Sequence, residues 1–103
     1  MDRPIVLLVS LFAHLGQEDG LRQFEAAAAR IMARYGGRIE RVLRPTATTP
    51  PADLPTEVHV VSFPDDASFA AYRADPDLAA LAPLRQASIA RTTIIFAAEG
   101  EAY

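Results

Sequence analysis

The segment from Glu57 to Phe96 constrains the fold of this chain more than any other part of the sequence. It begins with EVHVVSF, a run rich in β-branched and aromatic residues that predicts a strand ending at Phe63. Pro64-Asp65-Asp66 then predicts a helix start with Asp65 as its N-cap, which makes this carboxylate pair structural rather than catalytic. Asp75-Pro76 predicts the end of that helix and the start of a second, short one. The segment closes on Ser88–Phe96, a β-prone run that predicts the last strand.

The first half of the chain supplies the remaining elements. Ile5–Leu11 is apolar except for Ser10, which predicts a central strand covered on both faces. Apolar residues at three- and four-residue steps predict a helix over 18–35, which Gly36-Gly37 ends. Arg38–Arg44 alternates with charge on both faces, as is typical of an edge strand. Pro45–Pro55 contains four prolines and predicts a long loop.

Together these segments run in the order β-α-β-β-α-β, which is the ferredoxin-like pattern. We therefore predict an α+β fold, with two helical regions on one face of a four-stranded antiparallel sheet, as a single domain over residues 1–103. The opposite sheet face would expose the apolar first strand, which is not stable in a soluble monomer. We expect the chain to pair face to face with a copy of itself, most simply by two-fold symmetry.

Composition excludes several classes of function. The chain has no cysteine and no lysine, so thiol catalysis, thiolate metal sites and Schiff-base chemistry are excluded. A net charge of −3 argues against general nucleic-acid binding. The apolar run Ile5–Ala13 is too short to span a membrane and lacks a signal-peptide cleavage site, so we expect a cytoplasmic protein without membrane association.

Several runs in the second half carry a resemblance. They are Val58–Pro64, the run DASFAAYRADP at 66–76, Leu84-Arg85 and Ser88–Arg91. This pattern resembles the uncharacterised bacterial family called domain of unknown function 1330. Members of that family look like dimeric α/β barrels, and the wider superfamily includes cofactor-free monooxygenases, isomerases and dehydratases of small molecules, beside members with no known chemistry. The resemblance implies this dimeric fold and names no catalytic residue. The chain has no Asn and no Trp, so it lacks the residue set of the quinone-forming monooxygenases.

His59 and Glu57 form the candidate catalytic pair. They lie two residues apart on a predicted strand, so their side chains share one face. A neighbouring carboxylate can orient a histidine as a general base. A structural alternative is that Glu57 pairs with Arg41 or Arg44 of the preceding strand, while His59 is a satisfied polar residue at the dimer interface.

Four further side chains are candidates for ligand binding. His14 follows the first strand, where loops often carry function, and we expect it at the opposite end of a parallel neighbouring strand from His59. Tyr72 either packs in the core or reaches a pocket between helix and sheet. Arg85 and Arg91 flank the start of the last strand and either clamp a carboxylate or pair with a surface aspartate.

The sequence supports two hypotheses about function. The first is a homodimer whose subunits each bind a small organic acid or aromatic metabolite, with His59 as base and Glu57 as its orienting group in a cofactor-free isomerase or oxygenase. The second is a non-catalytic homodimeric module that binds a ligand, or a protein through the proline-rich loop. No phosphate loop, serine nucleophile motif or run of metal ligands is present, so neither cofactor nor metal is expected.

Overall fold

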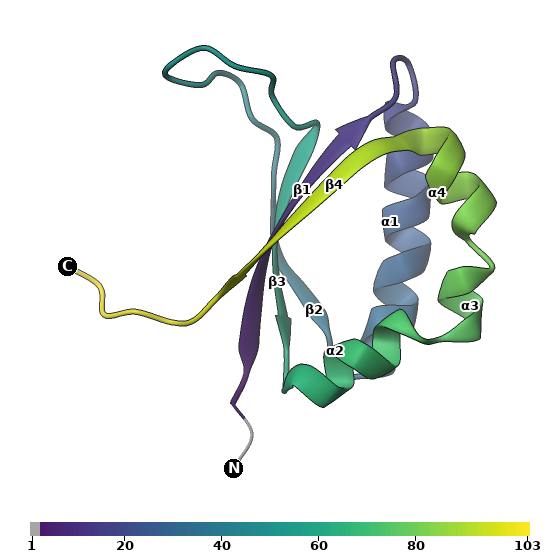
Figure 1. Ribbon diagram of the computed structural model, residues 1–103, viewed down its shortest axis with the longest axis vertical. Helices are drawn as coiled ribbons and strands as arrows, with labels where there is room; N and C mark the ends of the chain where they lie inside the picture. Colours follow the sequence, from purple (N-terminus) through teal and green to yellow (C-terminus); the bar gives the residue numbers. More distant parts are fainter. Residues whose placement is uncertain (1–2) are drawn as a thin grey trace.

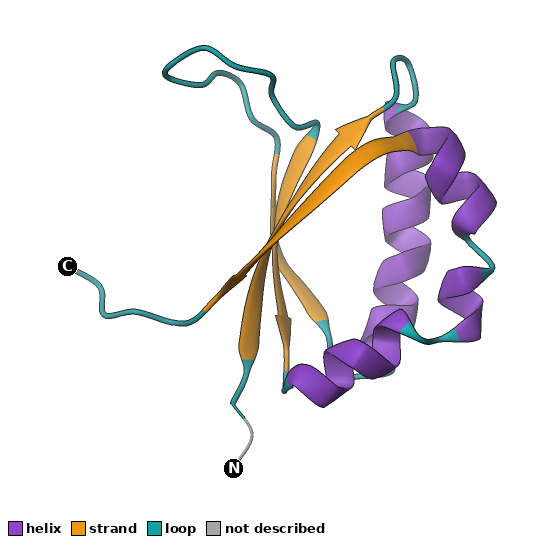
Figure 2. Cartoon of the chain, viewed as in Figure 1, coloured by secondary structure: helices purple, strands orange, loops and turns teal. Residues whose placement is uncertain are grey.

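The computed structural model describes residues 3–103, in which all the helices cover one face of a four-stranded antiparallel sheet (Figure 1; Figure 2). The strand order in the sheet is β2-β3-β1-β4. The elements, in chain order, are β1 (Ile5–Ala13), α1 (Glu18–Ala33), β2 (Arg38–Leu43), β3 (Glu57–Phe63), α2 (Asp66–Arg73), α3 (Pro76–Ala79), α4 (Ala82–Ser88) and β4 (Ile89–Ala97). The predicted α+β, ferredoxin-like fold is confirmed.

Strand β3 shows how the sheet is covered on one side. Its alternate residues are fully buried, because a strand points successive side chains to opposite faces. The buried set is Glu57, His59, Val61 and Phe63. In the register of the sheet, Val61 lies opposite Leu7 of β1, and His59 lies opposite Val9. The helix-covered face is therefore apolar over most of its area, with two polar side chains inserted from β3.

Two adjacent glycines make the turn from α1 to β2, and each is needed for a different reason. Gly36 has a φ of +73°, a left-handed conformation that glycine adopts without a steric penalty. Gly37 has an ordinary φ but is closely packed, since a Cβ there would lie 2.5 Å from Cε1 of Phe63. The turn begins earlier than predicted, so α1 ends at Ala33 rather than at Tyr35.

The connection from β3 to β4 contains three helices, where the sequence predicted two. Asp65 caps α2 by accepting the Ser68 amide at 2.7 Å, and Asp75 caps α3 by accepting the Asp77 amide at 2.7 Å, as predicted for the two Asp-containing starts. The predicted second helix is divided because Pro83 has no amide hydrogen and cannot continue a preceding turn, so it lies in the first turn of α4 instead.

Strand β2 contains an irregularity that the alternating sequence did not reveal. Its register with β3 shifts between Ile39 and Arg41, so Glu40 is an extra residue. Val42 therefore lies opposite His59 on the helix-covered side, whereas Arg41 lies opposite Val60 on the other side. Strict alternation along Arg38–Arg44, as predicted from the sequence, would put Ile39 and Arg41 on one face, and this prediction is wrong because of the extra residue.

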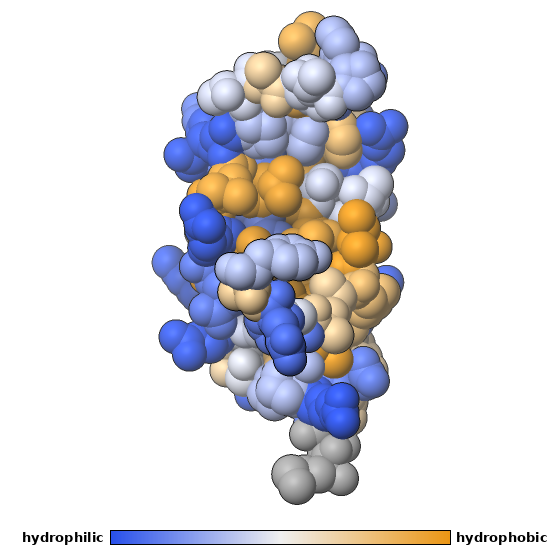
Figure 3. Space-filling model, turned by 90° about the vertical axis from the view of Figure 1, so that its left-hand side faces the viewer, coloured by the Kyte–Doolittle hydropathy of each residue, from blue (hydrophilic) through white to orange (hydrophobic). Residues whose placement is uncertain are grey.

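The sheet face opposite the helices is uncovered in the single chain. Leu8 lies between Val60 of β3 and Ile95 of β4 on this face, and the exposed fractions of Leu8 and Ile95 are 36% and 59%. Figure 3 shows hydrophobic residues gathered across the middle of the face, with hydrophilic residues around them. Strand β1 is thus covered on its helix side only, and coverage of its second face requires a partner.

Candidate active site

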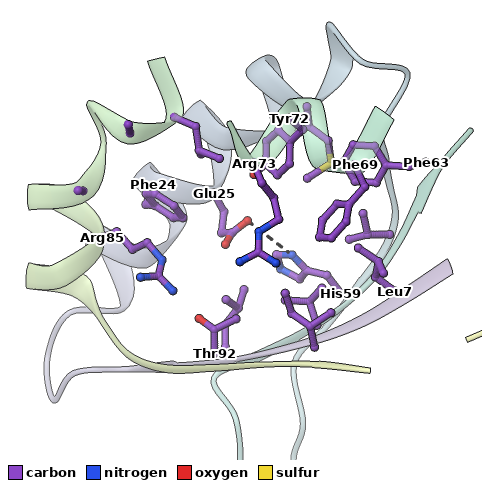
Figure 4. A pocket seen from close by; sticks show the side chains of 18 residues that line it. Leu7, Phe24, Glu25, His59, Phe63, Phe69, Tyr72, Arg73, Arg85 and Thr92 are labelled. Atoms are coloured by element: carbon purple, nitrogen blue, oxygen red, sulfur yellow. Dashed lines mark ion pairs between the residues drawn. The ribbon is translucent and has the colours of Figure 1, made fainter. Parts of the chain in front are cut away.

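A cavity of about 390 Å³ lies between the helix-covered face of the sheet and the helices (Figure 4). Its walls are mainly aliphatic and aromatic side chains, including Phe24 of α1 and Phe69 of α2. A smaller set of polar residues also lines it, namely Glu25, His59, Tyr72, Arg73, Arg85 and Thr92. A concave, mostly apolar space of this size with a few polar groups is typical of a small-molecule site.

His59 is held at the sheet side of this cavity by a carboxylate. Its Nε2 lies 2.9 Å from Oε1 of Glu57, and since a carboxylate can only accept, Nε2 carries the proton and donates it. Glu57 is in turn fixed by Arg44, whose Nε donates to Oε2 at 3.0 Å. Both side chains are buried, with exposed fractions of 2% for His59 and 4% for Glu57. In the neutral ring this arrangement fixes the tautomer of His59, with the proton on Nε2 and the electron pair on Nδ1.

The catalytic and the structural interpretation of Glu57 and His59 each describe part of the observed geometry. Glu57 contacts His59 and also pairs with Arg44, which was one of the two arginines proposed as its partner. His59, however, lies on the helix-covered face and lines the cavity, so the suggestion that it belongs to a dimer interface on the open face is wrong. The catalytic roles of His59 and Glu57 stay predictions.

Glu25 of α1 is a site residue that the sequence reading missed. Its Oε2 lies 3.8 Å from Nδ1 of His59, and both side chains line the cavity; the dashed line in Figure 4 marks this contact. Burial raises the pKa of the Glu25 carboxyl above its ordinary value of 4.5, and a positive charge on His59, when that ring is protonated, opposes this effect. A signal was present, because Glu25 is four residues after Leu21 and three before Ala28, both on the buried stripe of α1.

Three residues from the helices of the second half complete the rim of the cavity. Tyr72 lies in an aromatic cluster with Phe63 and Phe69, and burial raises the pKa of its hydroxyl to about 12, so the hydroxyl stays protonated at neutral pH. The guanidinium of Arg73 lies 5.6 Å from the centre of the Phe69 ring. Arg85 of α4 directs its guanidinium into the cavity from the opposite side (Figure 4). Tyr72 and Arg85 therefore both line the cavity, and their predicted contacts with a ligand stay predictions.

Thr92 of β4 contributes an unsatisfied polar atom to the cavity. Its Oγ1 is buried, and among residues 3–103 it has no hydrogen-bond partner. Thr92 lies opposite Leu11 in the register of β1 and β4, and both residues line the cavity. Buried hydroxyl groups in folded proteins nearly always have a partner, so this one requires an explanation.

Two residues predicted to bind a ligand lie outside the cavity. A ring nitrogen of His14 lies 3.1 Å from the carbonyl oxygen of Gln86 and donates to it on the surface. The Arg91 guanidinium lies 4.0 Å from the centre of the Phe12 ring. Because Arg91 pairs with Phe12 across β4 and β1, both side chains lie on the open face rather than under the helices.

The prediction that His14 and His59 lie at opposite ends of parallel neighbouring strands is wrong. Strands β1 and β3 are antiparallel, so the start of β3 lies beside the end of β1 rather than at the far end of the sheet. Within the part of the chain that the structure describes, no group of three histidine or acidic residues is arranged to hold a metal ion. Among the same residues, no helix has the length and hydrophobicity needed to cross a membrane.

The fold and the cavity place the chain in a class of small ferredoxin-like proteins that includes dimeric α/β barrel-type members. Residues 6–98 match the domain of unknown function DUF1330, and the chain belongs to this family. The resemblance drawn from the sequence is thereby confirmed. No protein of curated function matches the chain.

Solved structures with the same fold share little sequence with this chain. A protein of unknown function from Rhodopseudomonas palustris is 16% identical, with a TM-score of 0.82 over 99% of this chain and 86% of that one. SnoaB, a cofactor-independent oxygenase from Streptomyces nogalater, is 16% identical, with a TM-score of 0.72 over 99% and 97%. A ferredoxin-like dabb family protein from Mesorhizobium loti is 20% identical, with a TM-score of 0.66 over 95% and 98%. At such identities these likenesses show the fold alone.

Proposed function

We propose that this protein is an isomerase-type enzyme that moves a proton on a small carbonyl compound without a cofactor. The observation that carries the proposal is the buried His59, whose Nε2 is held by Glu57 while Nδ1 faces Glu25 and the cavity. A general base needs a free electron pair, a fixed orientation and access to substrate. The electron pair on Nδ1 of His59 is free, because the 3.8 Å separation from Glu25 is too long for a hydrogen bond. Glu57 fixes the orientation of the ring, and His59 lines the cavity that a substrate would enter.

Glu25 suits the complementary role of general acid. Burial raises the pKa of its carboxyl, which favours the protonated form that can donate to a substrate oxygen. In the proposed step, Nδ1 of His59 takes a proton from the carbon beside a carbonyl group, and the Glu25 carboxyl gives its proton to the carbonyl oxygen. The C–H bond breaks, an O–H bond forms, and the product is the enol. Transfer of the proton from His59 back to Glu25 restores both groups.

Proton exchange at carbon provides the test. Phenylpyruvate, phenylacetone and 4-oxo-4-phenylbutanoate have acidic C–H groups beside a carbonyl, and their exchange in D₂O can be followed by NMR. We expect the wild-type protein to accelerate exchange on at least one of them, and His59→Ala to lower the rate by about 100-fold or more. His14→Ala is the matched control and should retain the wild-type rate, since His14 lies outside the cavity. Equal rates for wild type and His59→Ala would remove this mechanism.

A cofactor-free oxygenase is the second candidate, favoured by the fold shared with the oxygenase SnoaB. Removal of a proton by His59 would leave an electron-rich carbanion that dioxygen can oxidise, so that a CH₂ group and O₂ become a carbonyl group and water. An oxygen electrode distinguishes the two candidates. Consumption of O₂ with the same substrates, lost in His59→Ala, would favour oxygenation, whereas exchange without O₂ consumption would favour the isomerase.

A further inference from the structure

We propose that Arg85 and Thr92 form a carboxylate subsite, and that the natural ligand is an organic acid whose apolar body fills the cavity. The proposal rests on the proposed function for the identity of the cavity as a substrate site. It narrows the small organic acid or aromatic metabolite expected from the sequence to an organic acid, and it adds a binding residue, Thr92, that the sequence analysis did not single out.

The first observation is the unpartnered hydroxyl of Thr92. Its Oγ1 is fully buried and has no hydrogen-bond partner within residues 3–103. Valine has the same shape and would fill this position without an unsatisfied polar atom. A buried hydroxyl that binds nothing costs stability, so the group is explained if a ligand atom completes it.

The second observation is the position of Arg85. Its guanidinium points into the cavity on the same side as Thr92, whereas Glu25 and His59 lie farther along the wall (Figure 4). Unlike Arg34 and Arg44, which pair with carboxylates, Arg85 has no carboxylate within 4.0 Å among residues 3–103, and its charge acts on Glu25 only from a longer distance. A planar guanidinium beside a hydroxyl donor is suited to a carboxylate, which can accept from both.

The geometry of the sheet separates this subsite from the proposed reacting groups. Thr92 lies on β4 opposite Leu11, while His59 lies on β3 opposite Val9, so β1 lies between them with an offset of two residues. Their backbone positions are therefore roughly 10–12 Å apart. Val9 and Leu11 of β1 lie between the two positions and form part of the apolar wall of the cavity. A ligand with a carboxylate a few bonds from its carbonyl group, joined by an apolar body, fits this arrangement.

The test compares a carboxylate with its neutral amide by calorimetry. The probes are 4-oxo-4-phenylbutanoate and 4-oxo-4-phenylbutanamide, which differ only in the group meant for the subsite. We expect the wild-type protein to bind the acid at least about tenfold more tightly, and Arg85→Gln to remove the preference. Arg30→Gln, an exposed arginine on α1, is the matched control and should keep it.

Thr92→Val separates a binding role from a structural one. This variant should weaken binding of the acid several-fold while making the free protein more stable towards urea, because it removes an unsatisfied hydroxyl. Thr93→Val, on the opposite face of the same strand, should leave acid binding unchanged. If Thr92 were purely structural, the Thr92→Val protein would instead be less stable than the wild type and would keep the wild-type affinity for the acid.

The outcomes distinguish this subsite from the proposed reaction. Equal binding of acid and amide by the wild type, no binding of either at millimolar concentration, or a preference that survives Arg85→Gln would overturn the subsite. A preference that depends on Arg85, without exchange on any probe, would support the subsite and count against the isomerase. Exchange on neutral phenylacetone that is unaffected by Arg85→Gln, together with equal binding of acid and amide, would support the isomerase and count against the subsite.

Discussion

At the scale of single residues, the burial of Glu25 predicts that the stability of the fold depends on pH. Because burial raises the pKa of its carboxyl above 4.5, the folded chain binds this proton more tightly than the unfolded chain does. The stabilisation from the proton is fully present below about pH 4.5 and is lost as the pH rises through the raised pKa. Glu25→Gln is uncharged at every pH, so its stability relative to the wild type should increase as the pH rises.

Urea unfolding from about pH 4 to about pH 8 measures this difference. The charged or titratable groups that face Glu25 are His59 and Glu57 on β3, Arg85 on α4 and Tyr72 on α2, and all remain in the variant. Glu101→Gln, in the exposed C-terminal segment, is the control and should show no such trend. A stability difference for Glu25→Gln that does not change with pH would contradict the burial of a titrating carboxyl.

The sequence predicted site residues that lie close together along the chain better than residues brought together by packing. Glu57 and His59 were found because two residues on one strand necessarily share a face. Glu25 lies on the apolar stripe of α1, which was a local signal, but only the packing of α1 against the sheet shows that it faces His59. Thr92 was missed because its place in the cavity comes from packing of β4 beside β1, which no local pattern encodes. His14 and Arg91 were placed near the site by sequence position, whereas the turn after β1 and the outward side of β4 direct them elsewhere.

At the scale of elements, the turn between α1 and β2 depends on the space at Gly37. A methyl group there would lie 2.5 Å from the ring of Phe63, which is 1% exposed and has little freedom to move. We expect Gly37→Ala to destabilise the protein by about 1–3 kcal/mol through overpacking. Gly100→Ala has nothing within 4 Å and should change stability by less than about 0.5 kcal/mol. Thermal unfolding of both variants checks the prediction, and equal midpoints would show that the aromatic core adapts to the methyl group.

The order of elements was predictable, whereas their internal breaks were not. Continuous or alternating apolar runs and the Asp caps identified every strand and the starts of α2 and α3. The bulge at Glu40 was hidden because one extra residue leaves the local sequence alternating while it reverses which face each later side chain occupies. The division at Pro83 had a signal in the sequence, since proline seldom continues a helix, but the leucine spacing suggested one helix.

At the scale of the whole molecule, the open face of the sheet leads to the prediction of a partner. The face carries Leu8, Val60 and Ile95 side by side, and Figure 3 shows the hydrophobic area that they belong to. We propose a second copy of the chain as the partner, because the same apolar face on each copy can cover the other. A two-fold axis would place the same apolar face of each copy against the other. The helices and the cavity lie on the opposite side of the sheet, so pairing would leave the cavity accessible.

Substitution of Ile95 by glutamate tests this pairing. We predict that the wild-type chain sediments as a dimer at micromolar concentration and that Ile95→Glu sediments as a monomer. Two-fold symmetry would bury the introduced carboxylate twice without a partner, at a cost of about 3 kcal/mol or more, which corresponds to about a 100-fold loss of affinity or more. Leu15→Glu is the matched control, because Leu15 is 99% exposed in the turn after β1 and should leave the dimer intact. A monomeric wild type, or an Ile95→Glu dimer of unchanged affinity, would show that the open face is not the dimer interface.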